Sequence, residues 1–320
     1  MSRSHGEPPI IAFSLTLLLS TWTAGAPMLR GDRLPRELID LLPEHTVGVV
    51  AINLRELAAT DLGKQVLAWS AEDFKSETFP YLPGKDVLRD AERIVIAHCI
   101  SEKDVNSVCI LIQLRTGATV AEALESRSSK SECKPKTIGK HKVYSLDRDL
   151  VAFALPDPRT LMLVICLGDD DESAAAQRAA YGERKTPGPN PDLRRLLERD
   201  RPAGFPIHFA GAHPTKASHA AGQLLFWGAG IAGQKINPIG AGLHAYVGGI
   251  CFGDAITGRI RFAAKDEDVA KDLLEKCHGS LKEGIEPRWK TAAQLSFEFL
   301  LDGKELTMEL RLEPAGSKSK

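Results

Sequence analysis

Apolar positions follow two different periods along the chain, and together they predict a mixture of strands and amphipathic helices. Val47–Leu54, Arg93–Ile100 and Val108–Arg115 are short segments rich in Val and Ile, which is typical of strands. Asp61–Trp69 instead places its apolar side chains three and four residues apart, which predicts a helix. The chain after residue 46 is therefore expected to run strand, helix and then a pair of strands.

Further strands and a helix are expected before a break in the pattern. Strands are expected near Lys142–Leu146, at Leu150–Leu155 and at Thr160–Leu167, followed by a helix at Asp169–Tyr181. The tract TPGPNPD at 186–192 then combines proline, glycine and asparagine, which is typical of a linker. This tract divides the chain into a first half at 27–185 and a second half at 193–314.

The second half repeats the order of elements of the first. The expected elements are a strand at Phe205–Ala210, a helix at Lys216–Trp227, strands at Leu243–Phe252 and Ala255–Ala263 around a Gly253-Asp254 turn, and a helix from Asp266 to about Leu281. Cys277 falls on the apolar side of that last helix and is expected in the core.

The clearest local pattern is a hairpin at Leu295–Leu312. Residues there alternate between apolar and polar on both sides of an Asp302-Gly303 turn. A turn at these two residues places opposite each other the pairs Leu295 and Leu310, Phe297 and Met308, and Phe299 and Leu306. The side chains expected on the other, wet face are Glu298, Thr307, Glu309 and Arg311.

These elements predict an α+β fold made of two similar halves. In each half we expect strands and helices in a ferredoxin-like order with extra strands, forming an antiparallel sheet with helices packed on one face. Residues 315–320 are expected to be a disordered tail.

Three segments resemble a known group of proteins. The run LLPEHTVGVVAINLRELAATDLGKQVLAW, the run KHKVYSLDRDLVAFALPDPRTLMLVI and the helix beginning KDEDVAKDLLEK are similar to recurring stretches of exported, uncharacterized proteins of planctomycete-type bacteria. The resemblance implies export and a duplicated α+β fold. It implies no activity, ligand or catalytic residue.

The first 26 residues have the pattern of a signal peptide. Ile10–Trp22 is an uncharged, mostly apolar run, and Thr23–Ala26 supplies the small residues that precede a cleavage point. A run of this length is shorter than a membrane-spanning helix needs, and no later segment is long and apolar enough to span a bilayer. We therefore expect a secreted or periplasmic protein. A segment retained as an anchor and a buried N-terminal helix are the alternatives.

Composition and charge limit the possible partners. Hydrophobic residues make up 43% of the 320 positions and charged residues 26%, which is ordinary for a globular protein. The formal net charge is −1, and nucleic-acid binding usually leaves a basic excess. We therefore expect no nucleic-acid partner, and an unknown protein or cell-envelope component instead.

Two of the six cysteines are candidates for a disulfide. A hairpin placed symmetrically about Asp104 puts Cys99 opposite Cys109, at a separation that a disulfide can bridge. Two separate buried thiols are the alternative. No C-x-x-C motif is present in the sequence, so zinc ribbons and thioredoxin-like redox sites are not indicated.

Three histidines form the only candidate metal site. His208, His213 and His219 lie within twelve residues, and neutral imidazoles bind zinc. However, they fall on an expected strand, loop and helix, and no H-E-x-x-H motif accompanies them. A metal-dependent hydrolase that uses these three residues is the alternative function.

Two other segments match or resemble the residue pattern of a functional motif but lack the structural context that the motif requires. Gly228–Gly233 fits G-x-G-x-x-G, but a helix is expected before it and Pro238 follows it, so no cofactor-binding residue is predicted. The acidic run Asp169–Glu172 is better explained by the start of a helix than by a calcium loop. With no catalytic residue predicted, the favoured function is an exported, non-catalytic binding or envelope-associated protein.

Overall fold

A computed structural model describes the core of the chain. The described residues are 34–64, 67, 90–100, 106–115, 135–146, 151–166, 170–182, 188–199, 205–212, 242–253, 255–284 and 293–314. The signal-like segment 1–26, the expected helix Lys216–Trp227 and the tail 315–320 lie outside these residues. Among the described helices, none combines the length and the hydropathy that crossing a membrane requires.

The described strands follow the expected order, except that β4 was not expected. The first half contains α2 (Arg36–Leu41), β1 (Thr46–Asn53), α3 (Leu54–Leu57), β2 (Ala91–Ile100), β3 (Asn106–Leu114), β4 (Pro135–Ile138), β5 (His141–Leu146), β6 (Val151–Asp157), β7 (Thr160–Cys166) and α7 (Asp170–Tyr181). The remaining elements are α8 (Pro191–Arg199), β8 (Ile207–Ala212), β9 (Leu243–Phe252), β10 (Ile256–Ala264), α10 (Glu267–Gly284), β11 (Ala293–Asp302) and β12 (Glu305–Pro314).

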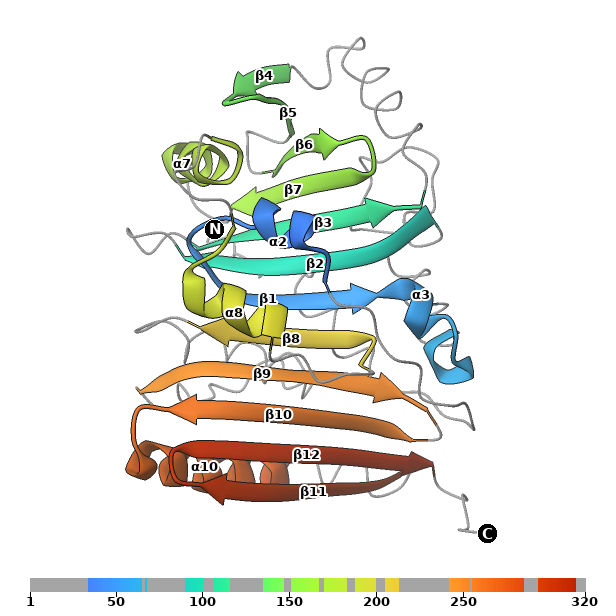
Figure 1. The fold of residues 1–320 in the computed structure, drawn as a ribbon, viewed down its shortest axis with the longest axis vertical. Helices are drawn as coiled ribbons and strands as arrows, with labels where there is room; N and C mark the ends of the chain where they lie inside the picture. Colours follow the sequence, from blue (N-terminus) through green and yellow to red (C-terminus); the bar gives the residue numbers. More distant parts are fainter. Residues whose placement is uncertain are drawn as a thin grey trace, which may run out of the picture.

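All described strands join one antiparallel sheet of twelve strands, in the order β11-β12-β10-β9-β8-β1-β2-β3-β7-β6-β5-β4 (Figure 1). The two halves meet at the centre, where β1 pairs with β8 from Gly48 opposite Gly211 to Ile52 opposite Ile207. The prediction of an antiparallel α+β fold is confirmed. The two halves nevertheless share a single sheet rather than forming one sheet each.

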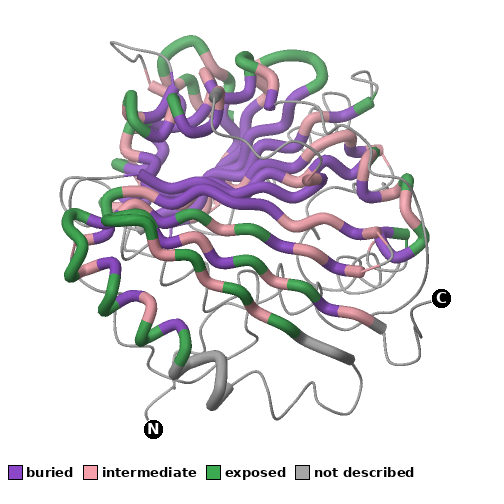
Figure 2. The backbone as a smooth tube through the Cα atoms, turned by 60° about the horizontal axis from the view of Figure 1, so that its bottom comes forward, coloured by how far each residue is buried: buried purple, intermediate pink, exposed green. Residues whose placement is uncertain are grey.

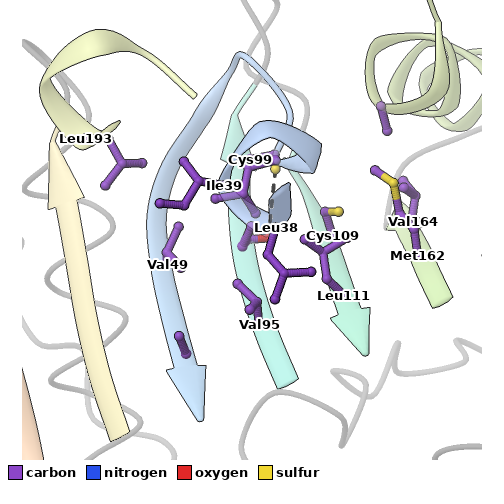
Figure 3. Packing of buried hydrophobic residues seen from close by; sticks show 14 of the residues in the cluster. Leu38, Ile39, Val49, Val95, Cys99, Cys109, Leu111, Met162, Val164 and Leu193 are labelled. Carbon is purple, nitrogen blue, oxygen red and sulfur yellow. Dashed lines mark hydrogen bonds between the residues drawn. The ribbon is translucent and has the colours of Figure 1, made fainter. Parts of the chain in front are cut away.

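One face of the sheet is covered by α2, α7 and α8, which lie over strands of the first half and the centre (Figure 1). Leu38 and Ile39 of α2 are almost fully buried against β1, β2 and β3 (Figure 3). Leu193 brings α8 into the same core. Burial of these apolar faces is the main force holding the helices on the sheet.

The opposite face is covered by α10, which packs on β10, β11 and β12. Leu273 and Cys277 of α10 join a core cluster with strand residues, so the expected core position of Cys277 is confirmed. Helices therefore lie on both faces of the sheet. The prediction of helices on one face is wrong, because the first-half strands carry buried apolar residues on both faces and the outer strands carry theirs on the face that α10 covers.

The ferredoxin-like arrangement of the halves is not confirmed. In the described residues the strands of each half lie outward from the central pair, as β1-β2-β3-β7-β6-β5-β4 on one side and β8-β9-β10-β12-β11 on the other. Chain neighbours thus lie mostly side by side, whereas a split βαβ unit would interleave them.

Aromatic rings fill the space above glycines near the centre of the sheet. A Cβ atom at Gly211 would lie 2.2 Å from the ring of Tyr246, and one at Gly248 would lie 2.6 Å from the ring of Phe209. These glycines are required because the two rings lie directly on the neighbouring backbone. Burial also raises the pKa of Tyr246.

Candidate functional site

The candidate site is built on the hairpin β11–β12 at one end of the sheet. Its turn consists of Gly303 and Lys304, because Asp302 pairs directly with Glu305. Gly303 has φ of +56°, a left-handed conformation that glycine adopts without a steric penalty. The predicted turn at Asp302-Gly303 is therefore displaced by one residue.

This displacement changes the partners of the hairpin but not its faces. Phe297 lies opposite Leu310 and Phe299 opposite Met308, two positions further along β12 than predicted. Because side chains alternate with a period of two, a shift of two residues keeps every side chain on the same face. The expected separation into an apolar and a wet face is confirmed.

The apolar face of the hairpin is held under α10. Leu306, Met308 and Leu312 are buried there, with exposed fractions of 0%, 7% and 4%. On the edge strand the ring of Phe299 lies 4.4 Å from the ring of His278, measured between centroids. These contacts fix the hairpin, so that its other face is presented on a rigid support.

We call the other side the outer polar face and define it by seven residues of three neighbouring strands: Arg259, Arg261, Glu298, Leu300, Thr307, Glu309 and Arg311. All except the half-buried Thr307 are exposed, and the tube drawing shows the resulting alternation along these strands (Figure 2). None of the three helices that cover this side of the first half has a described contact with these strands of three or more residue pairs.

The outer polar face carries charges of both signs: Arg259 lies opposite Glu309, and Glu309 also lies opposite Glu298. The Arg259 guanidinium lies 3.3 Å from the Glu309 carboxylate, with side-chain exposures of 57% and 53%. Arg311 contacts Glu313 at 2.6 Å on the same side of β12. Exposed pairs of this kind add little to stability, so they leave both charges accessible to a partner.

An exposed leucine lies among these charges. Leu300 is 65% exposed and is the one large apolar side chain recorded as exposed in the described part of the chain. It lies opposite Thr307, which in turn pairs with Arg261. Thr307 therefore separates Leu300 from Arg261, and the charged positions that flank Leu300 on β11 and β12 include Glu298 and Glu309. Arginine and an exposed apolar side chain on one face are a composition that protein interfaces favour, whereas a polyanion would require an excess of positive charge.

The predicted pairing of Cys99 with Cys109 is wrong. Cys99 lies opposite Ser107, and Cys109 lies opposite Ala97, because the β2–β3 register differs from the symmetric hairpin by two positions. The two cysteines are not joined in a disulfide, and both are almost fully buried. The Cys99 sulfur lies 3.5 Å from the Thr46 hydroxyl, which agrees with the alternative of separate core thiols.

Only one of the three candidate metal ligands falls in the described part of the chain. His208 lies on β8 between Ala51 of β1 and Gly249 of β9, with an exposed fraction of 5%. His213 and His219 lie outside the described residues. Within the described ranges, no group of three His, Cys, Asp or Glu side chains could hold a metal ion. The hydrolase hypothesis therefore stays an untested prediction.

The expected linker is fastened to the central strands. Asn190 caps α8 by accepting a hydrogen bond from the Leu193 N–H at 3.0 Å. Its side-chain amide also donates to the carbonyl oxygens of Ala212 at 2.9 Å and Thr46 at 3.3 Å. One side chain thus ties α8 to the adjoining ends of β1 and β8.

A second fastening joins the two helices above the centre of the sheet. Arg194 of α8 donates hydrogen bonds to Asp40 of α2 and to Glu198 of its own helix. The Asp40 carboxylate is the largest cause that raises the pKa of Arg194. The arginine is thereby fixed as a permanent cation within the helix pair.

The comparisons with known proteins are sparse. No protein-family model and no curated protein matches the chain. Among solved structures, crystal form I of TP0453 has a TM-score of 0.48 at 9% sequence identity, over 90% of this chain and 95% of that one. Crystal form IV of TP0453 has a TM-score of 0.46 at 8% identity, over 87% and 92%. Neither similarity bears on a ligand or an activity.

Proposed function

We propose that this chain is an exported, non-catalytic binding protein of the cell envelope that docks a protein partner on the outer polar face. The observation that carries the proposal is the exposure of Leu300 on a rigid sheet face that also carries three arginines and two glutamates. A partner surface that pairs with Arg261 and Arg311 and covers Leu300 fits this composition.

The near balance of charge supports a protein rather than a polyanion as the partner. The outer polar face carries three arginines and two glutamates, with Glu313 and Glu305 at its border. Complementary charges on a protein surface can be matched to this pattern one by one, which favours specific orientation of the partner. A nucleic acid would meet two to four carboxylates at the same place.

Site-specific photocrosslinking in the native host tests the proposal. A photoreactive amino acid replaces Leu300 in one strain and Glu275, an exposed residue of α10 on the opposite face, in the control strain. We expect a discrete crosslinked protein from position 300 and none from position 275. The crosslinked protein is then purified, and Arg261→Glu is expected to weaken its binding in solution at least tenfold.

Two results would reject the proposed docking face. One is an equal crosslinking pattern from both positions. The other is an unchanged affinity of the purified partner for the Arg261→Glu chain. In the second case, the charge pattern on the outer face would have no part in binding.

Export is a separate element of the proposal and has its own test. The apolar run Ile10–Trp22 and the small residues at 23–26 support it. Mass spectrometry of the protein from fractionated cells should find it outside the cytosol with a new N-terminus at residue 26 or 27. A cytosolic chain that retains residues 1–26 would contradict export.

We also propose that the two halves arose from one duplicated unit. The support is the matching outward order of β1, β2 and β3 on one side and β8, β9 and β10 on the other. In each half the next two strands outward form an antiparallel hairpin in reversed order, β7-β6 and β12-β11, and the first half continues with β5 and β4. The match lies in the order of elements, as it does in the sequence.

A further inference from the structure

The two ends of the sheet are built differently. At one end β4 has only four residues, and these include Pro135 and Lys136. Short length, proline and lysine are the usual features that prevent an edge strand from pairing with another chain. At the other end β11 is ten residues long, contains neither proline nor lysine, and pairs with β12 along its whole length without a bulge.

The edge of β11 that faces away from β12 is a regular template for another strand. In a two-residue turn the flanking residues, here Asp302 and Glu305, form a hydrogen-bonded pair. Even-numbered residues of β11 are therefore expected to bond to β12, and odd-numbered residues to direct their N–H and C=O groups outward. Among the described strands, β12 is the only neighbour of β11.

We infer that β11 pairs with β11 of a second copy of this chain, antiparallel and centred on Phe297. In this register the strand from Ala293 to Leu301 pairs with the same residues of its partner. The symmetry axis is perpendicular to the sheet, as in a closed two-fold dimer. The assembly is a continuous sheet through both copies, with no free β11 edge.

Repulsion between like charges favours pairing centred on Phe297 over pairing centred on Glu298. Centring on Glu298 would place that carboxylate opposite its own copy, which is unfavourable. Centring on Phe297 instead places Glu298 opposite Ser296 of the second copy and Leu300 opposite Gln294. Centring on Phe299 shortens the paired segment, since Leu295 then meets the turn residue Gly303.

The dimer goes beyond the proposed function because it concerns assembly rather than what is bound. An axis perpendicular to the sheet places the outer polar faces of both copies on the same side, next to each other. The exposed Leu300 side chains then lie on one shared surface.

Charge substitutions at Ser296 test the register with opposite signs. Ser296 is exposed and lies opposite Arg311 within its own chain. In the dimer, Ser296→Lys creates two new pairs with Glu298 of the second copy, and Ser296→Glu creates two repulsive ones. Sedimentation equilibrium of the purified chain should show dimerisation strengthened by lysine and weakened by glutamate, each by about two- to thirty-fold.

The free energy of unfolding of the single chain provides the control, because each Ser296 substitution should change it in the direction opposite to its effect on dimerisation. Next to Arg311, Ser296→Glu should stabilise the monomer and Ser296→Lys should destabilise it, as measured by unfolding at low protein concentration. A change in dimerisation that merely follows the stability of the fold would therefore run in the wrong direction.

A double substitution separates the remaining registers. Adding Glu298→Gln to Ser296→Lys should abolish the gain if the pairing is centred on Phe297, since the lysine loses its partner. Persistence of the gain would indicate pairing with Asp302 and overturn the stated register.

The proposal is also overturned if the chain sediments as a monomer throughout a dilution series, or if lysine and glutamate at position 296 shift dimerisation equally or not at all. Crosslinking of a partner at Leu300 could succeed in either case, so the two proposals fail separately.

Discussion

At the scale of single residues, the buried hydroxyl of Tyr181 is the most informative polar group of the core. Its oxygen lies 2.8 Å from the Ala152 carbonyl oxygen and 3.0 Å from the Met162 carbonyl oxygen. It therefore joins α7 to two neighbouring strands. Burial is the main cause that raises the pKa of Tyr181 well above its ordinary value.

This pKa predicts that stability falls at alkaline pH. Above about pH 10 the unfolded chain releases the phenolic proton while the folded chain retains it, so stability decreases by about 1.4 kcal/mol per pH unit for each such tyrosine. Burial raises the pKa of Tyr246 as well and that of Cys277 to about 11, so the total slope is steeper. Urea unfolding between about pH 8 and about pH 11 measures how steeply the free energy of unfolding falls. Tyr181→Phe should reduce this slope by about 1.4 kcal/mol per pH unit, the contribution of one proton. An unchanged slope in that variant would contradict the raised pKa.

Gly303 allows a second prediction at the same scale. A Cβ atom at this position would meet nothing within 4 Å, so only the left-handed backbone opposes a side chain. Gly303→Ala is expected to destabilise the chain by about 1–2 kcal/mol, and Gly303→Asn by less, because asparagine tolerates this conformation. Thermal unfolding of the two variants checks the order. Equal losses would indicate a steric rather than a conformational cause.

At the scale of elements, α8 shows why the expected linker is more than a connection. Pro191 occupies the first helical position and Asn190 the cap, which is a normal helix start. The same residues are also typical of a proline-rich loop, so the sequence did not predict α8. The short strand β4 was missed for a similar reason, since its proline and lysine are typical of a loop.

Two substitutions of Asn190 separate its capping role from its contacts with the strands. Asn190→Asp keeps the cap acceptor but loses the amide donor to Thr46 and Ala212. If the strand contacts matter, Asn190→Asp should cost at least as much as Asn190→Ala, about 1–3 kcal/mol, since the carboxylate would face two carbonyl oxygens. Chemical denaturation measures both variants. A nearly neutral Asn190→Asp would mean that capping alone explains the residue.

The β11–β12 hairpin shows how much of the structure a local sequence pattern can predict. Alternation with a period of two correctly predicted that Glu298, Glu309 and Arg311 lie on the wet face. The partners were displaced because Asp-Gly can occupy either the turn or its first flanking position. The same alternation places Leu300, two positions after Glu298, on the wet face, but an apolar residue there is not a recognisable site signal. Arg259 could not be assigned to the site from the sequence, because the pairing of β10 with β12 joins segments on either side of a helix.

At the scale of the whole molecule, local sequence patterns could not predict that the two halves join in one sheet. The pairing of β1 with β8 connects residues that are more than 150 positions apart, and a strand sequence does not specify its partner at such a distance. The same pairing makes the halves depend on each other. Leu38 from the first half and Leu193, Ala210 and Val247 from the second share one core cluster.

This shared core predicts that both halves unfold in a single transition. Separating them would expose the facing edges of β1 and β8 and divide the cluster, so a state with one folded half is unfavourable. Pulsed thiol labelling along a urea gradient can follow Cys109 in the first half and Cys277 in the second, since both are buried in the folded chain. We expect the two thiols to become reactive at the same urea concentration. Two distinct midpoints would mean that each half retains a core of its own, and that the central strand pair joins two independently stable units.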